Sequence, residues 1–167
     1  SQIMLLKKQH GYAKGTIKDE LNVQIINHPL FPGQEDCKSN KAVYYHSLIL
    51  SIYHWMIFDH TLAYKYSKAL LKDDNQNILP SDYINGLFQH ITSSVCVKKF
   101  KDALKGIQVA QAYMEEYKLN QSNAYRQLFF AYSSTYKLII YGYTGEKDKL
   151  KEAIEDTIKQ LDIWSDF

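Results

Sequence analysis

The chain has 167 residues, 46% of them hydrophobic, which is enough for one domain with a packed core and excludes a disordered chain. Only 7 glycines and 3 prolines are present, too few for the many tight turns of an all-β sandwich. The net charge is +2 and Arg126 is the only arginine, so the composition argues against binding to nucleic acid or to a membrane surface.

The first part of the chain, residues 1–38, is expected to form N-terminal helices and a loop that pack on the remainder. Residues 1–10 are typical of a short helix. A capping-box pattern followed by apolar residues four apart predicts a second helix over 16–27. Pro29 ends this helix, because the residue before a proline is disfavoured in the α region, and residues 30–38 then form a loop.

Three helix pairs are predicted over residues 39–167, where apolar residues recur three and four positions apart. The links between the helices are short, so neighbouring helices should be antiparallel and the fold class all-α. The last helix starts near residue 146 and carries Leu150, Ile154, Ile158 and Leu161 as its apolar residues. The other starts and breaks are expected at Ser39 or Asn40, Asp59, Pro80, residues 97–99, residues 118–122, and Gly142 with Gly145.

A repeat is visible in the second helix of each pair. Apolar positions spaced four and then three apart occur at Leu62, Tyr66 and Ala69, at Ala103, Ile107 and Ala110, and at Ile154, Ile158 and Leu161. The first two of these sets start 41 positions apart. Small residues at such positions let helices approach closely, and the aromatic residue fills the space between hairpins.

This pattern resembles the tetratricopeptide repeat, with the stretch at residues 58–70 as the closest match. The resemblance covers roughly residues 39–164 and extends to uncharacterised bacterial helical-repeat proteins. It implies an α-α superhelix of about three stacked hairpins, because one hairpin cannot bury its apolar face alone. It supplies no enzymatic activity.

The resemblance also implies that the first helices line a concave groove, which would bind an extended peptide or a partner helix. Each residue expected there could equally serve packing. We would test Arg126 first, and we expect charge reversal at Arg126 or truncation of Phe88 to weaken a partner without unfolding the domain. The groove residues expected from the positions of the aromatic side chains are Tyr44, Ser51, His54, Trp55, Asn85, Phe88, Asn123, Arg126 and Phe130.

The sequence indicates no catalytic residues, cofactor or metal. His46 and His54 are eight residues apart, about 12 Å along a helix, which is too far for one ion. Ser94 and Cys96 do not lie in any recognisable nucleophile signature. Structural roles are therefore expected for these side chains.

The cellular setting is expected to be the cytoplasm. No apolar run reaches the ~18 residues needed to cross a bilayer, and no signal peptide opens the chain. Cys37 and Cys96 are far apart and give neither a zinc spacing nor a disulfide framework. The chain starts without methionine and stops just after an amphipathic helix, which favours a piece of a longer protein.

The sequence therefore predicts a non-enzymatic module that binds a protein or peptide, with self-association through a terminal repeat as a second mode. One alternative is a regulatory or sensor domain of a larger protein, such as a transcription regulator. Another is a metal-dependent enzyme that uses His54, Asp59 and His60. A nucleic-acid binder is the third alternative, and a steep salt dependence of binding would mark it.

Overall fold

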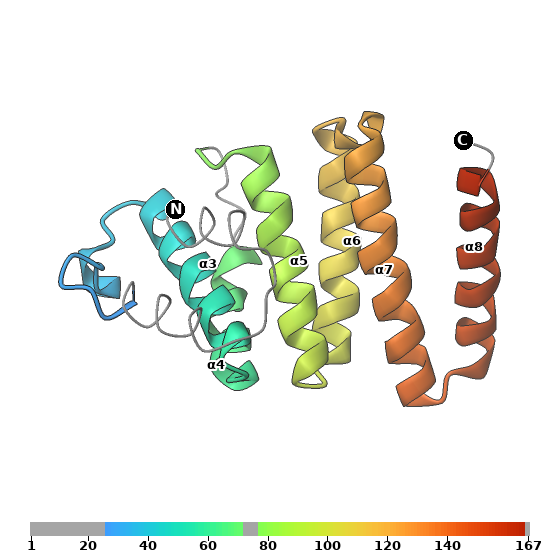
Figure 1. The fold of residues 1–167 in the computed structure, drawn as a ribbon, viewed down its shortest axis with the longest axis horizontal. Coiled ribbons are helices and arrows are strands. Elements are labelled where there is room, and N and C mark those ends of the chain that lie inside the picture. The colour runs from blue at the N-terminus through green and yellow to red at the C-terminus, as the bar shows by residue number, and fades with distance from the viewer. Residues whose placement is uncertain (1–25, 72–76, 166–167) are drawn as a thin grey trace.

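A computed structural model describes residues 26–71 and 77–165 of the chain. Within these ranges every regular element is a helix, so the prediction of an all-α fold is confirmed (Figure 1). The predicted N-terminal helices lie outside the described residues, except for Ile26 and Asn27. The α-helices are α3 (Asn40–Met56), α4 (His60–Ser67), α5 (Pro80–Cys96), α6 (Phe100–Glu116), α7 (Asn123–Thr144) and α8 (Lys147–Ser165).

Three hairpins follow one another along the long axis of the molecule (Figure 1). In each hairpin the two helices pack on each other, α3 on α4, α5 on α6 and α7 on α8. The first helices also contact one another, α3 with α5 and α5 with α7. Among the described helices, α8 packs chiefly on α7, at the end of the row. None of them has both the length and the apolar character needed to cross a membrane.

Local capping chemistry sets the helix starts where the sequence predicted them. The Ser39 hydroxyl accepts a hydrogen bond from the Ala42 amide at 3.1 Å and caps α3. The Asp59 carboxylate accepts one from the Leu62 amide at 3.0 Å and caps α4. Pro80 occupies the first position of α5, where its missing N–H removes no helical bond.

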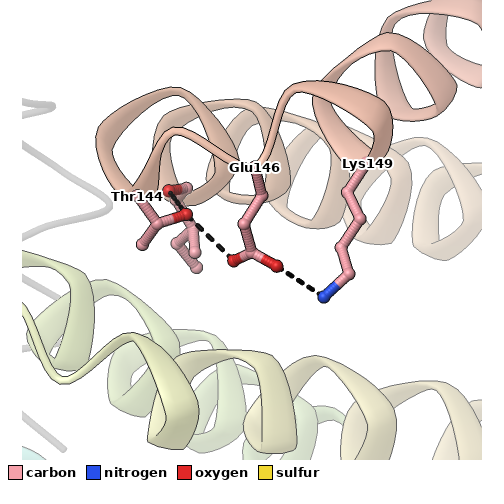
Figure 2. A network of polar contacts seen from close by, with 4 residues as sticks. Thr144, Glu146 and Lys149 are labelled. Carbon is pink, nitrogen blue, oxygen red and sulfur yellow. Dashed lines mark hydrogen bonds and ion pairs between the residues drawn. The ribbon is translucent and has the colours of Figure 1, made fainter.

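The expected end of α7 at Gly142 with Gly145 is confirmed for Gly145 and is wrong for Gly142. Helix α7 continues through Gly142 to Thr144, and Gly145 forms its C-terminal cap with φ of 73°. Only Gly145 needs the left-handed conformation that glycine adopts without strain. Figure 2 shows the turn that follows, in which the Thr144 hydroxyl lies 2.9 Å from a Glu146 carboxylate oxygen and Lys149 pairs with the same carboxylate.

The first two hairpins repeat with a period of 40 residues. Helices α3 and α5 are both 17 residues long and start at Asn40 and Pro80, and each three-residue link holds its middle residue, Phe58 or Lys98, at positive φ. The sequence-based alignment of Leu62 with Ala103 was therefore one residue out of register. Buried residues that correspond at this period are Tyr44 and Ile84, Ser47 and Leu87, Leu48 and Phe88, Leu50 and His90, Ser51 and Ile91, Ala63 and Ala103, Ser67 and Ile107, and Leu70 and Ala110.

Tyrosines join one hairpin to the next through aspartates in the first turns of α5 and α6. The Tyr45 hydroxyl donates to the Asp82 carboxylate at 2.5 Å, and the Tyr64 hydroxyl donates to Asp102. Burial, together with the bond to Asp82, raises the pKa of Tyr45 to about 12. The bond to Asp102 is the main reason that the pKa of Tyr64 rises to about 12. These bonds fix the register between hairpins.

Two helical glycines should respond in opposite ways to alanine. A methyl group at Gly86 would lie 1.9 Å from the hydroxyl oxygen of Tyr44, whose side chain is buried, whereas one at Gly142 would meet nothing within 4 Å. We expect Gly86→Ala to lower the free energy of unfolding by about 1–3 kcal/mol, as overpacking does. Gly142→Ala should raise it by about 0.5–1 kcal/mol, since alanine is the better helix former. Urea unfolding of both variants tests the pair, and two changes of the same sign would contradict it.

Candidate functional site

Three of the predicted groove residues are buried, and their assignment to an exposed groove is corrected. Tyr44, Ser51 and Phe88 expose 4%, 0% and 2% of their surface. They lie on the sides of α3 and α5 that face neighbouring helices. The Ser51 hydroxyl donates to the carbonyl of Ala63 on α4, and the ring of Phe88 stacks on Tyr132 of α7. These side chains hold the hairpins together and are not available to a partner.

His54 belongs to the packing between α3 and α4. Its ring stacks on Tyr66 with centroids 5.4 Å apart, and its Nδ1 is 4.0 Å from an Asp59 oxygen. Burial lowers the pKa of His54 below its usual value, although the charge of Asp59 opposes this. His54 and His60 each have a buried Nδ1 without a hydrogen-bond partner. In the described part of the chain, no three His, Cys, Asp or Glu side chains are grouped so that they could hold a metal ion.

Asn123 and Arg126 lie in the first turn of α7 and are exposed, and the Arg126 guanidinium donates to the Asn123 amide oxygen. Arg126 lies seven residues before the buried Ser133 and shares its side of the helix. Leu128 and Ile139, which are eleven residues apart and exposed, lie on a different side. A partner contact at Arg126 therefore stays a prediction, and it would use a different face of α7. Phe130 is half-buried.

Asn85, Thr92 and Cys96 form a partly exposed face of helix α5. These residues are spaced seven and four apart, so they lie on one side of the helix. Asn85 and Thr92 are half-buried and Cys96 is exposed. This face adjoins both neighbouring first helices.

Side-chain contacts connect that face to α3 and α7. The side chain of Trp55, at the end of α3, lies close enough to the Cys96 thiol to lower its pKa. On the other side, the hydroxyls of Thr92 and Tyr136 are 2.8 Å apart. Leu128 and Ile139 extend the surface along α7, with 38% and 45% of their surface exposed. We call this surface the first-helix strip and define it as Trp55, Asn85, Thr92, Cys96, Leu128, Tyr136 and Ile139.

The cysteine in the strip is not activated as a nucleophile. Burial of its sulfur raises the pKa of the Cys96 thiol, although the side chain of Trp55 opposes this. Because the thiolate is the reactive form, a thiol with a raised pKa stays protonated and inert at neutral pH. The strip carries no charged side chain. Its chemistry is that of an apolar and aromatic contact surface with hydroxyl and amide groups.

A serine–histidine cluster lies inside the protein. His90 Nδ1 is 3.0 Å from the Ser67 hydroxyl, and its Nε2 is 3.3 Å from the Ser94 hydroxyl. Ser67 donates its own proton to the carbonyl of Tyr64, so it accepts from Nδ1–H, and Ser94 then donates to Nε2. Burial lowers the pKa of His90 to about 4. His90 exposes 1% of its surface and both serines 0%, so the cluster joins α4 to α5 without access for a substrate.

Of the residues on this strip, Trp55 and Asn85 were expected on the predicted groove, whereas Cys96, Leu128, Tyr136 and Ile139 were not predicted as surface residues of a site. The 40-residue period was the signal available in the sequence for Cys96. It makes Cys96 the equivalent of Met56, because each is the last residue of its first helix. Comparisons of the chain with protein-family models, curated proteins and solved structures find no match.

Proposed function

We propose that the domain is a non-enzymatic, cytoplasmic protein-interaction module with a tetratricopeptide-like superhelix, and that it binds a peptide or partner helix on the first-helix strip. The strip offers half-exposed aromatic and aliphatic side chains with hydroxyl and amide groups between them. Such mixed surfaces suit protein segments, since large apolar contacts supply affinity and polar groups orient the bound chain. Reduced Cys37 and Cys96 are compatible with a cytoplasmic setting.

One observation carries this proposal. Side chains from three successive first helices adjoin one another, through Trp55 with Cys96 and Thr92 with Tyr136, and remain partly accessible. Leu128 and Ile139 on α7 are also exposed, although packing of the core does not require apolar residues at exposed positions. Exposed apolar residues that gather on one surface commonly mark a binding site.

Capture of partners from the native cell, followed by mass spectrometry, tests the proposal. Wild-type protein should retain a partner that Trp55→Ala and Ile139→Asp release by tenfold or more, because central aromatic and aliphatic anchors dominate interface energies. Circular dichroism should show all variants folded. Lys105→Glu, an exposed charge reversal on α6, is the neutral control and should retain the partner.

Arg126→Glu adds a comparison between two faces of α7. Binding on the first-helix strip predicts that Arg126→Glu retains the partner, since Arg126 does not share a face with Ile139, whereas the groove expected from the sequence predicts release. Release by Arg126→Glu with retention by Trp55→Ala and Ile139→Asp would reject the strip and move the binding surface to the first turn of α7. Retention by all four variants would reject both surfaces.

A further inference from the structure

Helix α8 exposes the apolar stripe that the sequence pattern identified. Ile154, Ile158 and Leu161 keep 43%, 54% and 51% of their surface exposed. The helix faces α7 through other residues, among them Ala153, which exposes only 8%. The first hairpin packs against the second, and the second packs against the third. In the described residues no further hairpin follows α8, which lies at the end of the row.

A row of charges of alternating sign runs beside the stripe. Glu155, Lys159 and Asp162 each follow one stripe residue, and Lys151 precedes them by one helical turn; the four are spaced four, four and three apart and are exposed. They therefore lie along one edge of the stripe. Lys151 and Glu155 approach within 3.8 Å of each other, an exposed pair that contributes little to stability. The order of these charges indicates which kind of partner helix can cover the stripe.

We propose that a second copy of this chain covers the stripe, with the two α8 helices packed antiparallel about a two-fold axis. In an antiparallel pair the same edge of each helix faces its own copy, as an isologous interface requires. Lys151 then faces Asp162 of the partner subunit, and Glu155 faces Lys159 of the partner subunit. In the same register Ile154 lies against Leu161 of the partner subunit, and the two copies of Ile158 meet near the axis. All four charges on each edge meet the opposite sign.

The dimer surface is separate from the first-helix strip, so this inference goes beyond the proposed function. Helix α8 has 19 residues and is about 28 Å long, and the contact is one helix wide. An interface of this size lies at the small end of specific interfaces and forms a reversible dimer. The occupied face is the end of the hairpin row, so dimerisation joins two rows end to end.

Sedimentation velocity across protein concentrations that bracket micromolar dissociation constants tests the dimer. The wild type should shift from monomer to dimer, and Ile158→Asp should weaken association at least 100-fold, because two buried carboxylates would meet at the axis. The matched control is Leu30→Asp, the same substitution at a leucine with 85% exposure far from α8, which should dimerise as the wild type does. Ile158 is half exposed in the monomer, so circular dichroism should find the variant folded.

A charge-swap series tests the occupant and the orientation together. Lys151→Glu and Asp162→Lys should each weaken the dimer severalfold, since each places like charges opposite one another. The double variant K151E/D162K restores opposite signs in the antiparallel arrangement and should recover wild-type association. A monomer at every concentration would overturn the proposal, as would a dimer insensitive to Ile158→Asp or a double variant no better than the singles. Partner capture by Ile158→Asp separates this result from the proposed function, which predicts that capture persists.

Discussion

Replacing Phe88 with alanine should lower the free energy of unfolding by about 3–5 kcal/mol, the range for a buried aromatic side chain in a packed core. Phe88 exposes 2% of its surface and stacks on Tyr132 with ring centroids 4.5 Å apart and planes 12° apart. Truncation leaves a cavity between α5 and α7 and removes the ring contact between two hairpins. The sequence-based expectation that this truncation leaves the domain folded and affects only a partner is therefore replaced.

Urea unfolding followed by far-ultraviolet circular dichroism measures the effect. Because a domain of this size is stabilised by only about 5–15 kcal/mol, the alanine variant could be partly unfolded before urea is added. Phe88→Leu keeps most of the volume and should cost about 1–2 kcal/mol, which keeps the test quantitative. Leu128→Ala on the exposed side of α7 is the control, with an expected loss below about 1 kcal/mol. A loss for Phe88→Ala no larger than that of the control would contradict the packing described.

Lowering the pH from about 6.5 to about 4 should reduce stability through His90 by roughly 3 kcal/mol. Burial lowers the pKa of His90 in the folded protein to about 4, from an ordinary value of 6.5. Between these values the unfolded chain binds a proton that the folded protein does not, so stability rises with pH across this window. The contribution is complete above the unfolded pKa and is lost as the pH falls toward the folded pKa.

Urea unfolding at several pH values, compared between wild type and His90→Gln, isolates this contribution from that of other titrating groups. The glutamine side chain can both donate and accept but does not titrate, so the variant should show a shallower loss toward acid pH. Nuclear magnetic resonance of the imidazole nitrogens gives a direct measurement on the wild type. It should find Nδ1 protonated at neutral pH, and titration of His90 near 6.5 would show the prediction to be wrong.

Helix starts were predictable because their chemistry is local. The hydroxyl of Ser39, the carboxylate of Asp59 and the ring of Pro80 each act within about one helical turn, so the sequence alone indicates where α3, α4 and α5 begin. The end of α7 was harder, because Gly142 and Gly145 are the same residue type and only the backbone conformation distinguishes them. The turn after Thr144 requires a positive φ at Gly145, and helix α7 simply continues through Gly142.

The side of each helix that meets a neighbour was not predictable from periodicity. Helices α3 and α5 are covered on several sides, so the 3.6-residue pattern marks Phe88 and Tyr44 as apolar without telling a hairpin contact from an exposed groove. In α8 the same pattern marks Ile158 as apolar, and the structure leaves it half exposed. The surface shared by Trp55, Cys96 and Tyr136 arises only when three helices are brought together, because no two of these residues are within a helical turn of one another.

Residues that form contacts between hairpins are separated by only a few tens of positions in the sequence. The hydrogen bonds between Ser67 and His90 and between Thr92 and Tyr136 span 23 and 44 positions, and those made by Tyr45 and Tyr64 fall between these limits. Formation of any one junction therefore closes only a modest loop of chain, with a small loss of entropy. Low contact order of this kind allows assembly to begin at any adjacent pair of hairpins and to spread in steps, so no early event has to wait for the two ends of the polypeptide to meet.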